Sequence, residues 1–425
     1  MILKEDFLHY LWKFQLFANK KLITLQNEEI VVLKPGLQNI NSGPDFFNAK
    51  IIIAEQTWAG NVEVHLKSSD WYLHHHETDV NYDNVILHVV WDHDVEIYRK
   101  DNTPIPTLEL KKFVSQNLLK NYQSLFSKKT KYILCEDQIG GVDKFTINNW
   151  FEKLYLERLE NKSIFILNLL DRSNNDWEMV LFQLLAKNFG LKVNNDAFFN
   201  LSASFDFSVL RKLQHKLINT EALFFGQAGF LFENIEDTYF QSLLEEYNFL
   251  RLKYLLEPIS KGQFYFFRLR PANFPTIRLA QLAMLFHLHQ NLFSKILDAK
   301  SIQDIYELFS VGVSDFWKTH YSFTSTSKRS NKYLTKPFID LLMINTIIPL
   351  LFVYQKEMGK PDFENILELI KEINPEKNSI ISRFKRLDVK VINTLETQAL
   401  LQLKNEYCNK MKCLQCAIGN RLLRS

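Results

Sequence analysis

The stretch GPDFFNAKIIIAEQTWAGNVEVHLKSSDW, residues 43–71, decides how the N-terminal part of this chain folds. It holds two runs typical of β-strands, Ala49 to Ala54 and Asn61 to Lys67, with a turn expected near Trp58 to Gly60. The first run carries three consecutive isoleucines, whereas the second alternates apolar and polar residues. Strict alternation places one face of a strand against a core and leaves the other face polar. The stretch therefore predicts a β-hairpin with one face available for chemistry.

Other strand and helix patterns lie on both sides of this hairpin. An amphipathic helix opens the chain, and further strands are predicted at Ile23 to Leu33, Val85 to Trp91, Val95 to Tyr98 and Thr107 to Leu110. After residue 111 the apolar residues recur at helical spacing. We therefore predict an α+β protein with two domains: a mixed-sheet α/β domain at residues 1–115 and a basic, all-helical domain at residues 116–425.

The composition is that of an ordered globular protein. Of 425 residues, 46% are hydrophobic and 23% charged, with only 12 Gly and 11 Pro, which excludes collagen-like, low-complexity and disordered classes. The first residues, MILKED, carry charges where a signal peptide has its apolar core, so we expect a cytoplasmic protein. The longest apolar stretch, Pro337 to Gln355, contains polar residues and predicts a buried helix pair, with no membrane as a partner.

Charge is unevenly distributed along the chain. Residues 1–110 hold 9 Lys and Arg against 16 Asp and Glu, a net charge of −7, although the whole chain has a net charge of +3. The rest of the chain is therefore strongly basic. An acidic part that binds a cation beside a basic part that holds a polyanion explains this division, and ordinary fluctuation is the alternative.

Two carboxylates of the hairpin are candidate metal ligands. Asp45 follows a Gly-Pro turn, and Glu63 comes eighteen residues later on the partner strand, so the hairpin is expected to bring both onto one ion. Oxygen ligands suit Mg²⁺ or Mn²⁺. His65 and Lys67 share the face of Glu63 and are candidates to orient an attacking water. An ordinary solvent-facing strand is the alternative.

Pro44-Asp45, followed by Glu63-Val64-His65, resembles the motif of the PD-(D/E)XK nuclease superfamily, with histidine in place of lysine. The resemblance implies a restriction-endonuclease-like mixed sheet in which Asp45 and Glu63 bind the catalytic metal. It also implies that His65 or Lys67 assists the nucleophile. Because the histidine departs from the superfamily's pattern, a degenerate site remains open.

Histidines cluster next to these carboxylates. Six of the eleven histidines fall within the 29 residues 65–93, among several aspartates. Imidazoles and carboxylates gathered in this way suit a transition-metal site or a proton-transfer chain. Candidates for a second shell or a second metal are His74, His76, Asp79 and His88. An exposed loop at residues 74–76 and a hydrogen-bonded core histidine at His88 are the alternatives.

The cysteines form a second candidate site. Cys408, Cys413 and Cys416 make a C-x4-C-x2-C run, and Cys135 is the only other cysteine of the chain. Four thiolates are enough for a Zn²⁺ or iron–sulfur site, which would tie the C-terminus to the junction after the first domain. Basic neighbours, Lys410, Lys412 and Arg421, are expected to favour thiolates. Cysteines that pack as small hydrophobic residues are the alternative.

Three arginines around the turn RPANFP are candidate phosphate contacts for a nucleic-acid partner. These are Arg268, Arg270 and Arg278, with the aromatic residues Tyr265, Phe266 and Phe274 close by in sequence. Cations bind the phosphate backbone, and aromatic rings stack on unpaired bases. Solvated helix faces are the alternative for these charges.

The motifs GPDF, GNVEVH, SSDW, LHVV and CLQCAIG together resemble an uncharacterised bacterial family of unknown function, over most of the chain. The leading hypothesis is a divergent metal-dependent nuclease that hydrolyses phosphodiester bonds of nucleic acid with Asp45 and Glu63 as metal ligands. Two alternatives stay open. One is a non-catalytic nucleic-acid-binding protein on a degenerate nuclease scaffold, and the other is a His/Asp metal hydrolase of a small substrate.

Overall fold

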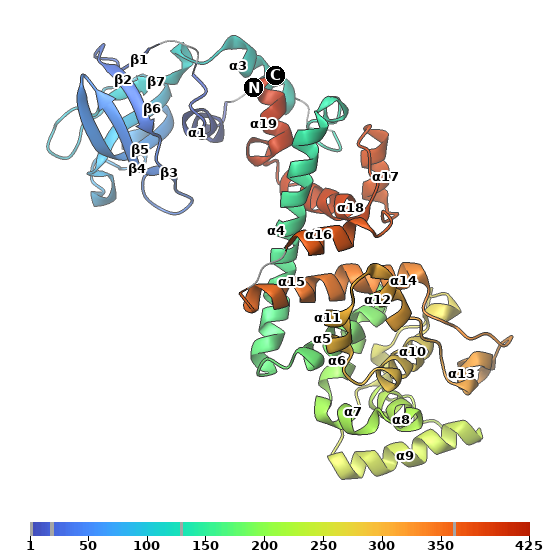
Figure 1. Ribbon diagram of the computed structural model, residues 1–425. Helices are drawn as coiled ribbons and strands as arrows, with labels where there is room; N and C mark the ends of the chain where they lie inside the picture. The colour runs from blue at the N-terminus through green and yellow to red at the C-terminus, as the bar shows by residue number, and fades with distance from the viewer. Residues whose placement is uncertain (1–2, 18–20, 128–130, 360–362) are drawn as a thin grey trace. The chain divides into compact units, whose positions relative to one another are not determined.

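The computed structural model describes residues 3–17, 21–127, 131–359 and 363–425, which form two compact units (Figure 1). The sheet unit comprises the chain as far as Trp150 together with Ser382–Lys390 and Leu401–Ser425. The helical unit comprises Phe151–Ile381 and Val391–Leu400. This division differs from the predicted boundary at residue 115, because later segments of the chain also pack in the sheet unit.

A seven-stranded mixed sheet forms the centre of the sheet unit, in the order β1-β2-β4-β5-β6-β7 with β3 paired to β4. The pairs from β1 to β5 are antiparallel, whereas β6 runs parallel to β5 and β7 parallel to β6. A mixed sheet followed by a large helical region confirms the predicted α+β class. The strands are β1 (Leu22–Ile23), β2 (Glu29–Lys34), β3 (Leu37–Gln38), β4 (Phe46–Ile53), β5 (Gln56–Lys67), β6 (Val85–Asp92) and β7 (Thr107–Glu109).

The hairpin of β4 and β5 turns earlier than predicted. Ile53 pairs with Gln56, and the two residues between them, Ala54 and Glu55, have φ values of 48° and 71°. Two consecutive positive φ values are typical of the tight turns that match the twist of a hairpin. The predicted turn at residues 58–60 is therefore wrong, because these residues belong to β5 and pair with β4.

Gly60 has a different role, which depends on the neighbouring strand. A Cβ atom at Gly60 would lie 2.5 Å from Cγ2 of Ile86 and 2.7 Å from the carbonyl oxygen of Asn84. No side chain fits into that space. The close approach of β5 to the start of β6 therefore requires glycine here.

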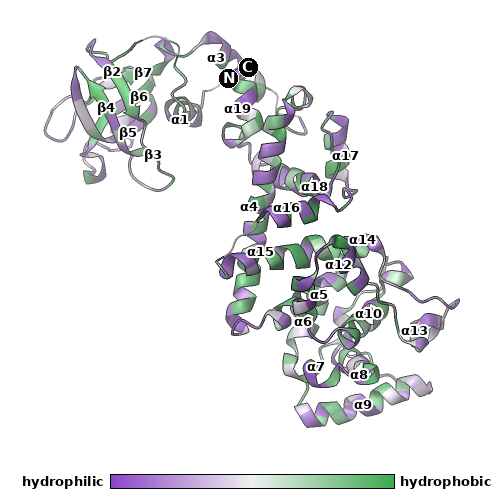
Figure 2. Ribbon diagram, viewed as in Figure 1, coloured by the Kyte–Doolittle hydropathy of each residue, from purple (hydrophilic) through white to green (hydrophobic). Residues whose placement is uncertain are grey.

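β6 is buried on both faces, as its apolar sequence predicts. The six residues Val85–Val90 are all buried, and the strand is largely coloured as hydrophobic in Figure 2. A small core beside it is made of Trp71, Tyr82, Val85, Ile97 and Ile105. The segment from Val95 to Tyr98, predicted as a strand, forms only a single bridge between Tyr98 and Pro104.

Helices from both ends of the chain complete the sheet unit. α1 (Glu5–Lys13) contacts β5, and α19 (Ala417–Arg424) contacts α3 (Gln116–Phe126). A single-turn helix, α2 (Asp70–Leu73), follows β5. Residues of α4 (Lys144–Arg172), α17 (Ser379–Arg386) and α18 (Thr394–Gln402) contribute to both units.

Helices and the loops between them make up the described residues of the helical unit, and its only strands there form a short hairpin, β8 (His320–Ser322) and β9 (Ser325–Thr326). The predicted all-helical region is therefore corrected by this one element. Its remaining helices are α5 (Trp177–Phe189), α6 (Leu191–Ala203), α7 (Phe207–Leu213), α8 (Leu217–Gln227), α9 (Thr238–Tyr254), α10 (Pro275–Leu288), α11 (Leu292–Asp298), α12 (Ile302–Leu308), α13 (Asp315–Thr319), α14 (Lys336–Leu342), α15 (Ile348–Glu357) and α16 (Phe363–Lys371).

The most apolar segment of the chain is one continuous helix. α14, a π-helical turn at Met343–Ile347 and α15 join into the helix Lys336–Glu357, in place of the predicted pair. By length and composition this helix is able to cross a membrane, but 67% of its most apolar window is buried inside the protein. A core helix of a soluble protein shows the same burial.

Gly60→Ala is expected to destabilise the sheet unit by about 1–3 kcal/mol, because the added methyl group overpacks the junction of β5 and β6. Gly141→Ala is the matched control, since a Cβ at Gly141 meets no atom within 4 Å. Urea unfolding of the two variants measures the difference. Equal midpoints for both would contradict the close approach at Gly60.

Candidate metal centre

Asp45 and Glu63 are brought together by the register of β4 and β5. Phe46 pairs with Val62, so Asp45 and Glu63 occupy the next position along the two strands. The backbone N–H of Asp45 donates to Oε2 of Glu63 over 3.1 Å, and the backbone N–H of Val64 donates to Oδ2 of Asp45 over 3.0 Å. Each carboxylate is thus held by the backbone of the opposite strand.

The other carboxylate oxygen of Glu63 faces two histidines, and one of them contacts a third. Oε1 of Glu63 lies 3.4 Å from Nε2 of His65 and 3.4 Å from Nε2 of His76. Nε2 of His65 lies 3.1 Å from Nδ1 of His74. Ligand atoms bound to one ion at about 2.0–2.2 Å lie roughly 3.0–3.5 Å from one another in tetrahedral or octahedral geometry. Glu63, His65, His74 and His76 are here called the histidine centre: the three histidines offer ligand atoms within 4.8 Å of one another, and Glu63 lies next to two of them.

The turn after β5 brings His74 and His76 to this centre. α2 ends at His74, and the backbone N–H of His76 donates to the carbonyl of Trp71 over 3.0 Å. His75 between them has a positive φ of 59°, so the chain folds back sharply. Tyr82 stacks on the His76 ring with centroids 3.7 Å apart. The two ligand candidates are thus positioned by a packed turn.

His88 lies behind His65 in the neighbouring strand. It is fully buried, and its Nε2 lies 2.9 Å from Nδ1 of His65. A second histidine in this position fixes the tautomer of the first and leaves Nε2 of His65 free for a metal. Nδ1 of His88 has no hydrogen-bond partner among the described residues. His88 therefore contacts the ring of His65 from the core side and holds it in place.

Burial sets the protonation states at the centre. Burial, together with the neighbouring imidazoles, lowers the pKa of His65 to about 2 and that of His88 to about 3, so both rings are neutral. Burial and the negative charge of Asp45 raise the pKa of Glu63 to about 9. Neutral imidazoles beside a carboxyl group that is only 4% exposed form a site that a cation would complete.

Two residues of α1 join Asp45 in a second group of possible ligands. Nε2 of His9 lies 3.1 Å from Oδ2 of Asp45 and 3.7 Å from Oε1 of Glu5, and one ligand atom from each of the three lies within 4.8 Å of the others. Burial alone would lower the pKa of His9, but Asp45 outweighs it and the pKa is raised. The i, i+4 spacing of Glu5 and His9 was visible in the sequence, but its docking on Asp45 was not.

Lys67 and Asp79, two further predicted site residues, have other contacts. Lys67 is exposed at the end of β5, where its backbone N–H donates to Asp70 over 3.0 Å. Asp79 caps the short helix Val80–Tyr82 by accepting the backbone N–H of Asn81 over 2.9 Å. Of the residues predicted on this face of the hairpin, Glu63 and His65 therefore belong to the histidine centre, whereas Lys67 does not. Asp79 stabilises the start of a short helix.

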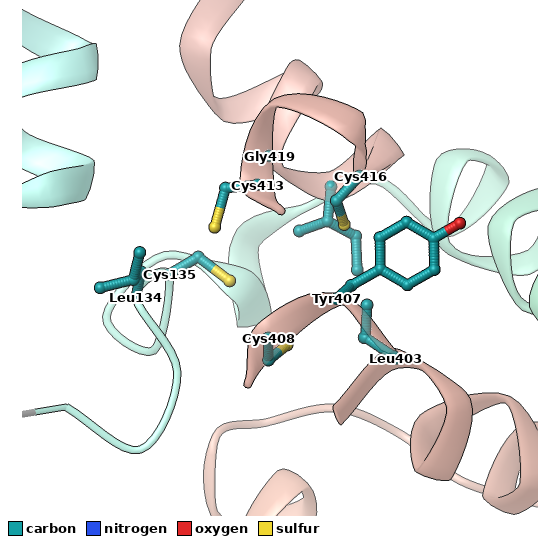
Figure 3. Close-up of a pocket in the computed structure, with 9 residues that line it drawn as sticks. Leu134, Cys135, Leu403, Tyr407, Cys408, Cys413, Cys416 and Gly419 are labelled. Carbon is teal, nitrogen blue, oxygen red and sulfur yellow. The ribbon is translucent and has the colours of Figure 1, made fainter. Parts of the chain in front are cut away.

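The four cysteines meet at one cavity in the sheet unit, which Figure 3 shows in close-up. Burial and mutual repulsion raise the pKa of Cys135 and of Cys413 to about 12, and burial also raises the pKa of Cys408 and of Cys416. The expected stabilisation of thiolates by basic neighbours is wrong, because Lys410 pairs with Glu406 and Arg421 with Asp143.

The three arginines of the helical unit differ in exposure. Arg268 and Arg270 are exposed, as are the nearby rings of Tyr265 (59%) and Phe267 (77%). Arg278 is buried, donates to Gln281 and Asn273, and lies over the ring of Phe338 at 3.6 Å. The prediction that Arg278 contacts phosphate is therefore wrong, because its guanidinium is used inside the protein.

Comparison with known protein families gives one match. The model of the family described as "Protein of unknown function (DUF2851)" matches residues 5–379. The chain belongs to this family. The match includes both groups of possible ligands and Cys135, but ends before Cys408, Cys413 and Cys416, so the part of the expected resemblance at residues 413–419 lies outside it. Neither the curated proteins nor the solved structures contain a significant match.

In metal-free protein, the stability of the sheet unit is expected to fall as the pH rises from about 7 to 9, above the range in which the buried neutral rings of His65 and His88 would gain protons in the unfolded chain. The folded protein holds a proton on Glu63 up to a pKa of about 9, whereas the unfolded chain releases it near 4.5. The stabilisation is thus complete below pH 4.5 and is lost toward pH 9, with a slope of at most about 1.4 kcal/mol per pH unit. Glu63→Gln removes this slope.

Urea unfolding in the presence of a chelator, at several pH values, measures both proteins. His75→Ala is the control, because His75 stands in the same turn but outside the histidine centre. The same pH slope in wild type and Glu63→Gln would contradict the buried, protonated state of Glu63.

Proposed function

We propose that this protein is a metal-dependent phosphodiesterase that acts on nucleic acid, with its metal held by the histidine centre. The observation that carries the proposal is the group of three histidines whose ligand atoms lie within 4.8 Å of one another, with Oε1 of Glu63 3.4 Å from His65 and 3.4 Å from His76. His74 is exposed whereas His65 is 1% exposed, so the centre reaches from the core to the surface. Substrate and water would approach the centre from the exposed side of His74.

The ligand set favours a transition metal. Imidazole nitrogens suit Zn²⁺ and Fe²⁺ best, and Mn²⁺ accepts them more readily than Mg²⁺, which prefers an all-oxygen shell. Of the two ions expected from Asp45 and Glu63, Mn²⁺ is therefore the better candidate. Asp45 was predicted to share one metal ion with Glu63. Its Oδ2 is instead directed to His9 and to the backbone of Val64.

A bound divalent ion supplies an activated water and polarises a phosphoryl oxygen. The chain's own residues position that chemistry. His88 orients His65, and Asp45 orients Glu63 through its backbone N–H. Glu5, His9 and Asp45 offer a second group of ligands next to the first, and two neighbouring cation sites are typical of enzymes that cleave phosphodiester bonds.

The resemblance to the PD-(D/E)XK nucleases supports the same reaction. Asp45 directly precedes β4, and Glu63 and His65 lie two residues apart on β5, within a mixed sheet. The histidine in place of lysine belongs here to the ligand set. That difference makes the proposed enzyme a divergent one.

The imidazole-rich ligand set also favours a second candidate, a metal hydrolase of a small substrate. Histidines dominate the centre, whereas the nuclease motif relies on two carboxylates. The two candidates differ in what they cleave. A panel of single-stranded and double-stranded DNA and RNA, together with a small chromogenic phosphodiester, separates them.

Glu63→Gln and His65→Ala are each expected to reduce Mn²⁺-dependent cleavage of nucleic acid by about 100-fold or more, because each removes a proposed ligand. His75→Ala is expected to retain the wild-type rate. Calorimetric titration with Mn²⁺ should show one tight site lost in the first two variants and kept in the third. Wild-type cleavage by Glu63→Gln would exclude the mechanism.

The exposed segment around Arg268 and Arg270 is proposed to bind the nucleic acid. The double variant Arg268→Ala/Arg270→Ala is expected to weaken binding of single-stranded DNA by about tenfold and to lower the salt slope by about 2, one for each lost phosphate contact. Arg172→Ala, an exposed arginine at the end of α4, is the control. Fluorescence anisotropy at several salt concentrations measures both effects, and an unchanged slope in the double variant would contradict the assignment.

A further inference from the structure

Every cysteine of the chain faces one space in the sheet unit. Cys135 comes from a turn after α3, and Cys408 ends a π-helical segment, Leu403–Cys408. Cys413 begins a short 3-10 turn, and Cys416 caps α19. All four line one cavity whose walls are otherwise mostly apolar, and in Figure 3 their sulfur atoms are turned toward it.

We propose that the four cysteines hold an iron–sulfur cluster that fastens the C-terminal segment to the sheet unit. The cluster is separate from the histidine centre and does not depend on the proposed function. Four thiolates with no disulfide among them satisfy the ligand requirement of such a cluster.

The spacing of the sulfur atoms favours a cluster over a single zinc ion. Four thiolates bound to Zn²⁺ at about 2.3 Å would lie about 3.8 Å apart. Among the described residues, two groups have three or more ligand atoms within 4.8 Å of one another, and neither contains a cysteine. No three of the described cysteine sulfur atoms lie that close together, so the four thiols do not have the separations of ligands around one zinc ion.

The surroundings of Cys416 are those of a cluster ligand. The backbone N–H groups of Ile418 and Gly419 follow Cys416 in the first turn of α19, where they are available to its sulfur. N–H donors of this kind stabilise a thiolate and set the reduction potential of a cluster. Gly419 is needed for this geometry, because a Cβ there would lie 2.1 Å from the carbonyl oxygen of Cys413.

The segment that the cluster fastens also contacts the helix that carries His9. Nδ2 of Asn121 donates to the carbonyl oxygens of Leu423 (3.2 Å) and Ser425 (2.9 Å), and Nε of Arg424 lies 3.3 Å from the hydroxyl of Tyr10 in α1. α1 in turn presents His9 to Asp45. The cluster therefore has a structural role, since it holds the C-terminal segment against α1 and α3.

The test uses the full-length protein, purified without oxygen and then reconstituted with ferrous iron and sulfide. Wild type should contain iron and acid-labile sulfide in equal amounts, with the visible absorption of an iron–sulfur cluster. Cys413→Ser should lose both, whereas Gln415→Ala, an exposed residue of the same turn, should keep them. Glu63→Gln should also keep the cluster, which separates this site from the histidine centre.

Removal of the iron should increase hydrogen exchange in residues 403–424 several-fold without a comparable change in the helical unit. Because this measurement and the metal analysis use wild-type protein, they test the proposed cluster even if the serine variants do not fold. Stoichiometric zinc without sulfide would overturn the cluster. The absence of bound metal after reconstitution would overturn the site altogether.

Discussion

The carboxyl group of Glu63 is buried in the sheet, and much of the sheet unit is arranged around it. An isolated carboxylate in such surroundings is costly, and its neighbours, His65 and His76, are neutral or weakly basic rings that do not balance the charge. Two structural solutions exist: the group is protonated, or a cation binds. The proposed metal site corresponds to the second solution, with His65 and His76 each 3.4 Å from Oε1 of Glu63.

Other contacts of the sheet unit hold the residues of the histidine centre in place. The parallel pair of β5 and β6 places Glu63 beside His88, because the two residues are in register. The turn after β5 is fastened by Asp94, which accepts hydrogen bonds from Ser68 and Ser69. These contacts fix the position of α2 and of the histidines that follow it. The rings are therefore oriented before any ligand arrives, which is the condition for tight and selective metal binding.

The features of the fold and of the candidate site that depend on residues close together in the sequence could be predicted from it. The separation of Asp45 and Glu63 along one hairpin predicts their proximity, because antiparallel register is set by a short stretch of chain. The apolar sequence of β6 predicts its burial on both faces. The thiol count predicts a common site for the cysteines, and the structure brings all four to one cavity.

The errors arise where distant parts of the chain meet. Gly60 suggested a turn, but its role is set by Ile86 in another strand. His9 was missed because only the docking of α1 brings it to Asp45. Arg278 suggested phosphate binding, since nothing in its neighbouring sequence shows that Phe338 covers it. In each case the deciding contact is made by a residue that the local pattern does not contain.

The most direct test of the central claim is X-ray absorption spectroscopy of the wild-type protein loaded with one equivalent of Mn²⁺. The account predicts nitrogen and oxygen ligands at about 2.0–2.2 Å with strong outer-shell scattering from about three imidazole rings. Both should disappear in the double variant Glu63→Gln/His65→Ala. A shell of oxygen atoms alone, without imidazole scattering, would contradict the assignment of the histidine centre as the metal site.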